Sequence, residues 1–131
     1  MNFQNRQDSQ NKKYHRLRAC CTVSEQRREY FRVEYPSGYR PRFIIKGQSF
    51  DILDVSECGI RFLHIDNASF IIGASIKGII RFTDGEELEC SGVVLRNELG
   101  AVAVQNDDPI SLARIRAEHL NLIRNFYSTY D

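Results

Sequence analysis

The stretch Ser49–Ile65, SFDILDVSECGIRFLHI, contains two apolar segments around a short polar one. Phe50, Ile52 and Leu53 come before the polar residues, and Ile60 and Phe62 follow them. Asp, Ser and Gly are typical of turns, so this pattern predicts two strands joined at DVSECG, residues 54–59. We therefore expect Asp54 to stand at the end of the first strand.

Similar short segments lie on both sides of this stretch. Ile44 and Ile45 precede KGQ, which is a turn signal, and Ile76–Phe82 lead into TDG, which is typical of a hairpin. Alternating residues from Tyr30 onward, Leu88–Val94 and Ala101–Val104 predict further strands. Short strands separated by turns indicate an antiparallel β-barrel or sandwich.

The period of the apolar residues changes after NDDP, residues 106–109. One helical face would carry six residues: Leu112, Ile115, His119, Leu122, Ile123 and Phe126. Asp108 can cap the helix and Pro109 suits its first turn. We expect a C-terminal helix over about 109–127 that packs on the barrel, in preference to one that fills a partner's groove.

Charge divides the 131 residues unevenly. Residues 1–32 hold eight Lys or Arg and three acids, a net of +5, whereas the other 99 hold ten and fourteen, a net of −4. We predict a flexible basic N-terminal arm over residues 1–26 and one globular domain over 27–131. Arginine outnumbers lysine by 14 to 4, which fits recognition of oxyanions or nucleotides, or a simple compositional bias.

Several classes of protein are disfavoured by what the sequence lacks. It contains no apolar run of the roughly 20 residues needed to span a bilayer, and its start has no signal-peptide core, so we expect a cytoplasmic protein without membrane insertion. The four cysteines and three histidines have no zinc-ligand spacing, which predicts structural or reduced thiols and no metal site. No GxSxG, HExxH, P-loop or paired-carboxylate motif suggests catalysis, so we expect no enzyme and no catalytic residues.

The stretch RREYFR, residues 27–32, concentrates positive charge where the first strand begins. In extended chain, Arg28 and Arg32 would lie on one side and Phe31 would point the other way, into the body. Two neighbouring guanidinium groups repel each other, and a phosphate or diphosphate between them would relieve that repulsion. Arginine also recognises guanine through O6 and N7. A solvated charge cluster is the alternative.

The stretch DVSECG offers complementary chemistry. The Asp54 carboxylate can accept from the N1–H and N2–H₂ groups of guanine, and Ser56 offers a short hydroxyl group. Gly59 can take a positive φ and let a ligand approach the backbone. An ordinary β-turn explains the same residues.

Taken together, RREYFR and DVSECG resemble the paired motifs of the PilZ domain family, and a looser likeness extends over residues 27–126. The resemblance implies a bacterial, cytoplasmic, six-stranded antiparallel β-barrel that binds cyclic di-GMP, uses no cofactor and is not an enzyme. Arg28 and Arg32, with Arg27 as a frequently basic neighbour, would contact phosphates and guanine. Asp54, Ser56 and Gly59 would hold a guanine edge. Some members seat a base with a later residue, for which Val94 and Arg96 are the nearest candidates.

The resemblance also implies a mechanism. Cyclic di-GMP, as a monomer or an intercalated dimer, would neutralise the arginines and order the arm, and the changed surface would be read by a protein partner. Two alternatives remain: a barrel that binds single-stranded nucleic acid, and a PilZ-like interaction module that binds no nucleotide. Aromatic residues among the arginines favour the first, while the acidic balance of residues 33–131 opposes it.

Overall fold

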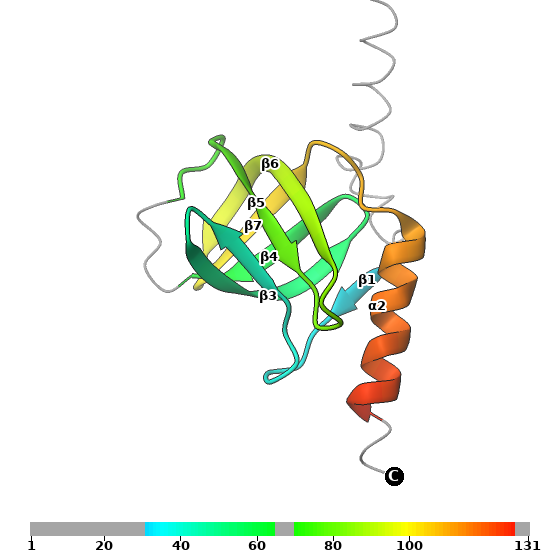
Figure 1. The fold of residues 1–131 in the computed structure, drawn as a ribbon. Coiled ribbons are helices and arrows are strands. Elements are labelled where there is room, and N and C mark those ends of the chain that lie inside the picture. Colours follow the sequence, from blue (N-terminus) through cyan, green and yellow to red (C-terminus); the bar gives the residue numbers. More distant parts are fainter. Residues whose placement is uncertain (1–30, 65–69, 128–131) are drawn as a thin grey trace, which may run out of the picture.

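The computed structural model describes residues 31–64 and 70–127, and Figure 1 shows their arrangement. The described residues form β1 (Arg32–Glu34), β2 (Arg42–Ile45), β3 (Gln48–Ser56), β4 (Gly59–Leu63), β5 (Ser75–Arg81), β6 (Glu87–Glu98), β7 (Ala101–Asn106) and α2 (Leu112–Asn125). Neither the predicted arm, residues 1–26, nor Arg27 and Arg28 fall within these ranges.

Six of the strands close into an antiparallel barrel. Their order is β3-β2-β5-β6-β7-β4, and pairing between β3 and β4 completes the ring. The short strand β1 pairs with the last residues of β3, Asp54–Ser56, beyond the part of β3 that pairs with β2, and it lies next to α2 (Figure 1). The predicted mostly β fold, a six-stranded antiparallel barrel followed by a C-terminal helix, is confirmed.

The barrel core follows from the alternation of apolar residues along the strands. Phe43, Ile52, Phe62, Ile80 and Val102 are each 0 % exposed, and they come from five different strands. The rings of Phe43 and Phe62 lie 5.2 Å apart between centroids in a tilted arrangement. Burial of these side chains is the main driving force for closing the barrel.

A bulge in β3 decides which side chains reach the surface beside β1. Ile52 pairs with Phe62, but the next pairs are Asp54 with Arg61 and Val55 with Ile60, so the register shifts between Ile52 and Asp54. Ile52 and Val55 are therefore both in the core, although strict alternation would separate them. Asp54 is turned to the outer side of the barrel as a result.

Helix α2 begins later than the sequence predicts. Its N-cap is Ser111, whose side chain accepts a hydrogen bond from the Arg114 amide at 3.1 Å, and not Asp108. The Ile110 amide donates to the Glu57 carbonyl at 2.8 Å, and the Ile110 side chain is buried. This contact holds the segment before Ser111 against the barrel, so it cannot join the helix.

The face of α2 that packs on the barrel also differs from the predicted one. Ile115 and Leu122 are buried as expected, but the third buried residue is Glu118, while Leu112, His119 and Ile123 are exposed. Glu118 can be buried because its carboxylate accepts from the Tyr35 hydroxyl at 2.6 Å and pairs with Arg114. The apolar period places the helix but cannot foresee a buried, paired carboxylate.

Arg114 links α2 to the rest of the barrel. Besides Glu118, its guanidinium pairs with Asp84 at 2.9 Å and lies 4.3 Å from the ring centroid of Phe82. Asn121 donates to the same Asp84 carboxylate at 3.2 Å. Burial opposes ionisation of Asp84, but the hydrogen bonds from Arg114, the Glu86 amide and Asn121 outweigh it and hold its pKa below the usual range.

Within the described ranges, α2 is too short and too polar to cross a membrane, and no other helix there meets that requirement.

Candidate functional site

The pairing of β1 with β3 brings the end of one motif against the other. Arg32 lies directly across from Ser56, and Glu34 lies across from Asp54. Directly opposed residues share a face of the sheet, and the intervening pair, Val33 and Val55, is buried in the core. Arg32, Asp54 and Ser56 therefore lie together on the outer side of the barrel.

Asp54 is the buried acid of this face, with 5 % of its surface exposed. Its Oδ2 atom accepts from Nε of Arg61 at 2.8 Å. Burial raises the pKa of the Asp54 carboxyl, and nearby Glu34 adds to the rise, while the charges of Arg61 and Arg32 oppose it. The Asp54 carboxyl group is thus largely removed from water, which disfavours its ionised form, while the two nearby arginines favour that form.

Arg61 is the site residue that the sequence reasoning missed. It pairs with Asp54 across β3 and β4, and its side chain is 43 % exposed. The signal was present, because Asp54 and Arg61 stand on opposite arms of the hairpin around Glu57 and Cys58. A bulge of one residue decides whether they face each other, and the sequence does not specify that bulge.

Gly59 serves a different purpose from the predicted one. Its φ is not positive, so it does not supply a left-handed turn. A Cβ atom at this position would lie 2.3 Å from the Val104 carbonyl oxygen of β7. The close approach of β4 to β7 therefore requires Gly59. The predicted positive φ is wrong, while the contact of Gly59 with a ligand stays a prediction.

The turn between β3 and β4 is also shorter than predicted. Strand β3 continues to Ser56, so Asp54 lies within the strand and does not end it. The Ser56 hydroxyl group donates to the Gly59 carbonyl at 3.4 Å, across the two-residue connection Glu57-Cys58. Cys58 is disulfide-bonded, whereas Cys90 is a free, buried thiol.

Arg32 is the arginine of the first motif that the structure describes. It is exposed, and among residues 31–64 and 70–127 it has no ion-pair partner within salt-bridge distance. Its charge nevertheless acts on the pKa of Asp54. Arg27 and Arg28 lie outside the described residues, so their assignment stays a prediction.

Phe31 packs on the helix and not in the barrel core. Its ring meets the His119 ring edge-on, with 4.8 Å between centroids, and 39 % of the residue is exposed. The side chain of Phe31 points toward α2, so the expectation that it points into the body of the barrel is wrong. Phe31 thus lies beside this helix, immediately before β1.

Arg96 is not brought to the site by strand pairing. It lies inside β6, across from Ala103 of β7, after a register shift that follows Val94. Among the described strands, β6 pairs with β5 and β7, so its pairing does not bring Arg96 to β3, and a contact of Arg96 with a ligand stays a prediction. Val94 is 1 % exposed and belongs to the core, so it cannot stack on a ligand at the surface.

No group of three or more His, Cys, Asp or Glu side chains suited to a metal ion occurs in the part of the chain that the structure describes.

Comparison with known proteins supports the fold. No family model and no curated protein matches the sequence. The structure is similar to that of the Bacillus subtilis inhibitor of motility, MotI/DgrA, with a TM-score of 0.56 and 22 % identity over 79 % of this chain. The chain spans about half of that protein, 52 % of its length. An uncharacterized Legionella protein, Lpg0364, aligns at a TM-score of 0.46 with 17 % identity, over 78 % of this chain and 100 % of its own.

Proposed function

We propose that the protein is a bacterial, cytoplasmic receptor for cyclic di-GMP and not an enzyme. The observation that carries this proposal is the register of β1 on β3, which places Arg32 opposite Ser56 and beside Asp54. Arg32, the last residue of the first motif that resembles PilZ domains, thus meets the second motif on one face of a six-stranded barrel. The likeness to an inhibitor of motility, a regulatory protein by its name, is in keeping with a receptor.

The chemistry of this face suits a guanine nucleotide that carries phosphates. Exposed Arg32 offers a planar fork to a phosphate or to O6 and N7 of guanine, and Ser56 adds a hydroxyl group. Asp54 would accept from guanine N1–H and N2–H₂. Because Arg61 now covers Asp54, its partly exposed side chain would turn aside or stack on the base when the nucleotide binds.

Binding would also act on the chain that leads into β1. Arg27 and Arg28 precede Arg32 in the same motif, and a ligand phosphate would relieve their mutual repulsion. The arm, residues 1–26, would then settle across the nucleotide and alter the surface seen by a protein partner.

Calorimetric titration of the full chain with cyclic di-GMP tests the proposal. We expect binding by the wild type and a loss of about 1–3 kcal/mol for Arg32→Ala and for Asp54→Ala, the range for removing one partner of a charged hydrogen bond. Arg42→Ala is the matched control, because Arg42 is an exposed arginine on β2 that pairs with Asp51. Absence of heat with the folded wild type would overturn the proposal.

The arm is tested separately by NMR on the same samples. If arm resonances keep random-coil shifts while the barrel is saturated with cyclic di-GMP, the nucleotide site stands and the arm mechanism fails.

A further inference from the structure

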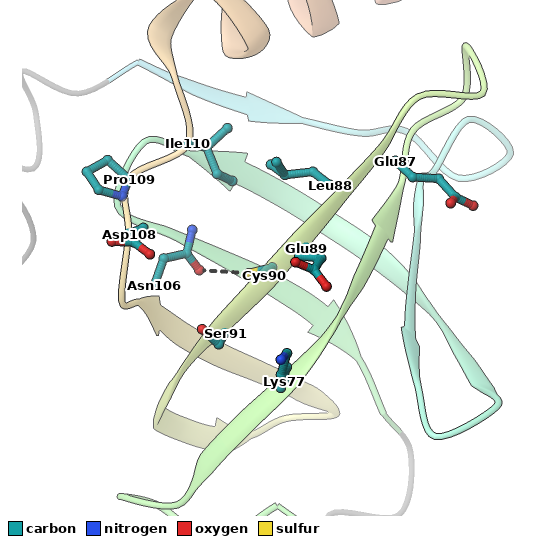
Figure 2. A pocket seen from close by; sticks show the side chains of 10 residues that line it. All are labelled: Lys77, Glu87, Leu88, Glu89, Cys90, Ser91, Asn106, Asp108, Pro109 and Ile110. Carbon is teal, nitrogen blue, oxygen red and sulfur yellow. Dashed lines mark hydrogen bonds between the residues drawn. The ribbon is translucent and has the colours of Figure 1, made fainter.

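A pocket of about 500 Å³ lies between strands β5, β6 and β7 and the segment that leads to α2 (Figure 2). Strand β6 supplies one wall with Leu88, Glu89 and Cys90, and Asn106, Pro109 and Ile110 supply the other. None of the residues proposed for nucleotide binding lines it. The pocket is therefore a separate site from the one proposed for the nucleotide.

Asn106 is a buried amide with an unused donor in this pocket. The residue is 4 % exposed, and its Nδ2 atom has no hydrogen-bond partner among the described residues. The Cys90 thiol donates to Oδ1 at 3.3 Å, and in Figure 2 the amide nitrogen points away from Cys90, toward the side bordered by Pro109 and Ile110. A buried donor without a partner has lost its hydrogen bond to water without compensation, so a ligand oxygen placed there would be favoured.

The orientation of that amide is fixed by its surroundings. Burial, and after it the charge of Asp107, raises the pKa of the Cys90 thiol to about 12, so the thiol keeps its proton at neutral pH and can donate. The backbone N–H of Asn106 donates to the Cys58 carbonyl at 2.9 Å. Both contacts leave Nδ2 directed to the pocket as a donor.

The charges at the rim select a cation. Glu87 is already paired with Arg81 at 2.7 Å, so Glu89 and Asp108 supply the spare carboxylates against the single ammonium group of Lys77, which leaves one negative charge in excess. Leu88 and Ile110 add apolar surface for an aliphatic stem. A phosphate group is therefore disfavoured, whereas a flexible cation that also carries a carbonyl oxygen matches all three features.

We propose that this pocket binds an arginine of a peptide segment, with its backbone carbonyl on Asn106 and its guanidinium group at the acidic rim. Arginine fits better than lysine because its guanidinium group is planar, weakly hydrated and able to hold a carboxylate through two hydrogen bonds. The segment we assign is this chain's basic arm, residues 1–26, and an arginine of another protein is the alternative outcome of the test below.

The arm is the source favoured by position and charge. Arg32 opposes Ser56 at the end of β3, and the next residue, Glu57, accepts from the amide of Ile110 in the pocket wall. The start of β1 thus lies near the pocket wall, and residues 1–32 carry a net charge of +5 against the acidic rim.

The test is an NMR titration of the full chain with acetyl-arginine methylamide, beside the uncharged isostere acetyl-citrulline methylamide. We expect shifts at Ser91, Ile110 and the Asn106 side-chain amide with arginine only. Glu89→Gln should weaken binding roughly fivefold, and Asn106→Leu should abolish the shift of the pocket wall. Glu98→Gln, an exposed carboxylate at the far end of β6, should leave the affinity unchanged.

The source is identified by repeating the titration with Arg16→Gln/Arg18→Gln. Tighter binding of the probe to this variant shows that the arm competes for the pocket, and unchanged binding assigns the pocket to an arginine of another protein. No pocket shifts in either chain, or equal shifts with citrulline, would overturn the proposal.

Discussion

Arginine and acidic side chains occur in two regions of the molecule, the outer face of β1, β3 and β4 and the interface between α2 and the barrel. They are paired differently in the two regions. At the interface, Arg114 contacts two carboxylates and an aromatic ring, and Glu118 is 1 % exposed. On the outer face, Arg32 is exposed and Asp54 holds a single arginine. Charged groups whose partners are all supplied by the protein stabilise the fold, whereas charged groups with unused donors or acceptors are suited to bind a ligand.

Burial makes the difference between the two regions measurable. The Tyr35 hydroxyl group donates to Glu118 and its pKa is raised well above the usual range, mainly by burial and next by the charge of Glu118. The contacts of Glu118 are therefore made away from water, where loss of one partner is costly. At the outer face, Arg32 is exposed to water, so removal of its side chain should change the free energy of unfolding little.

The largest effect is expected from Arg114→Ala. It leaves the buried Glu118 carboxylate without its cation, and removal of one partner from a buried ion pair costs about 3–5 kcal/mol. The free energy of unfolding from urea titration measures this loss. Arg116→Ala, on the exposed side of the same helix, should change it by less than about 0.5 kcal/mol. Equal effects of the two substitutions would contradict the distinction between the regions.

The next largest effect is expected from Gly59→Ala, beside the outer face. Its Cβ would meet the Val104 carbonyl oxygen, and β4 would have to move away from β7. Overpacking of this kind costs typically about 1–3 kcal/mol. A lower thermal midpoint with the β4–β7 amides exchanging faster would support a structural purpose of Gly59, while unchanged stability would show that the strands adapt.

The smallest stability effect is expected from Arg32→Ala. Arg32 is exposed and has no salt bridge among the described residues, so the free energy of unfolding should stay within about 0.5 kcal/mol of the wild type. The same variant should lose affinity for cyclic di-GMP in the titration described above. Strong destabilisation would mean that Arg32 supports the fold, and would contradict the claim that the charges of the outer face contribute little to stability.

The free energy of unfolding should depend on pH differently in the wild type and in Asp54→Asn. The folded-state pKa of Asp54 is raised above its ordinary value of 3.8, so the folded protein holds this proton more tightly than the unfolded chain. The wild type should therefore lose stability as the pH rises from about 3.8 through the folded pKa, relative to Asp54→Asn, which does not titrate there. Urea titrations of both proteins between pH 3 and pH 7, in roughly half-unit steps, measure the difference, and a constant difference would contradict the raised pKa.

Much of the fold was predictable because local rules agree with it. KGQ and TDG lie in the connections β2–β3 and β5–β6, where Gly47 and Gly85 take positive φ values that favour glycine. The pairing of RREYFR with DVSECG correctly placed Arg32 near Asp54 and Ser56. The errors in the φ of Gly59, the end of β3 and the start of α2 arose where contacts between segments far apart in the chain, and not local preference, decide the conformation.

By itself, the sequence determined the number and kind of strands, the existence of the helix and the charged residues of the two motifs, because periodicity and turn preferences are local properties. The tertiary structure alone decided that a bulge turns Asp54 toward Arg61, that Glu118 is buried beneath Arg114, and that Asn106 keeps an unused donor. Those outcomes depend on strand register and on burial of polar groups among partners far apart in the chain, which no local pattern encodes.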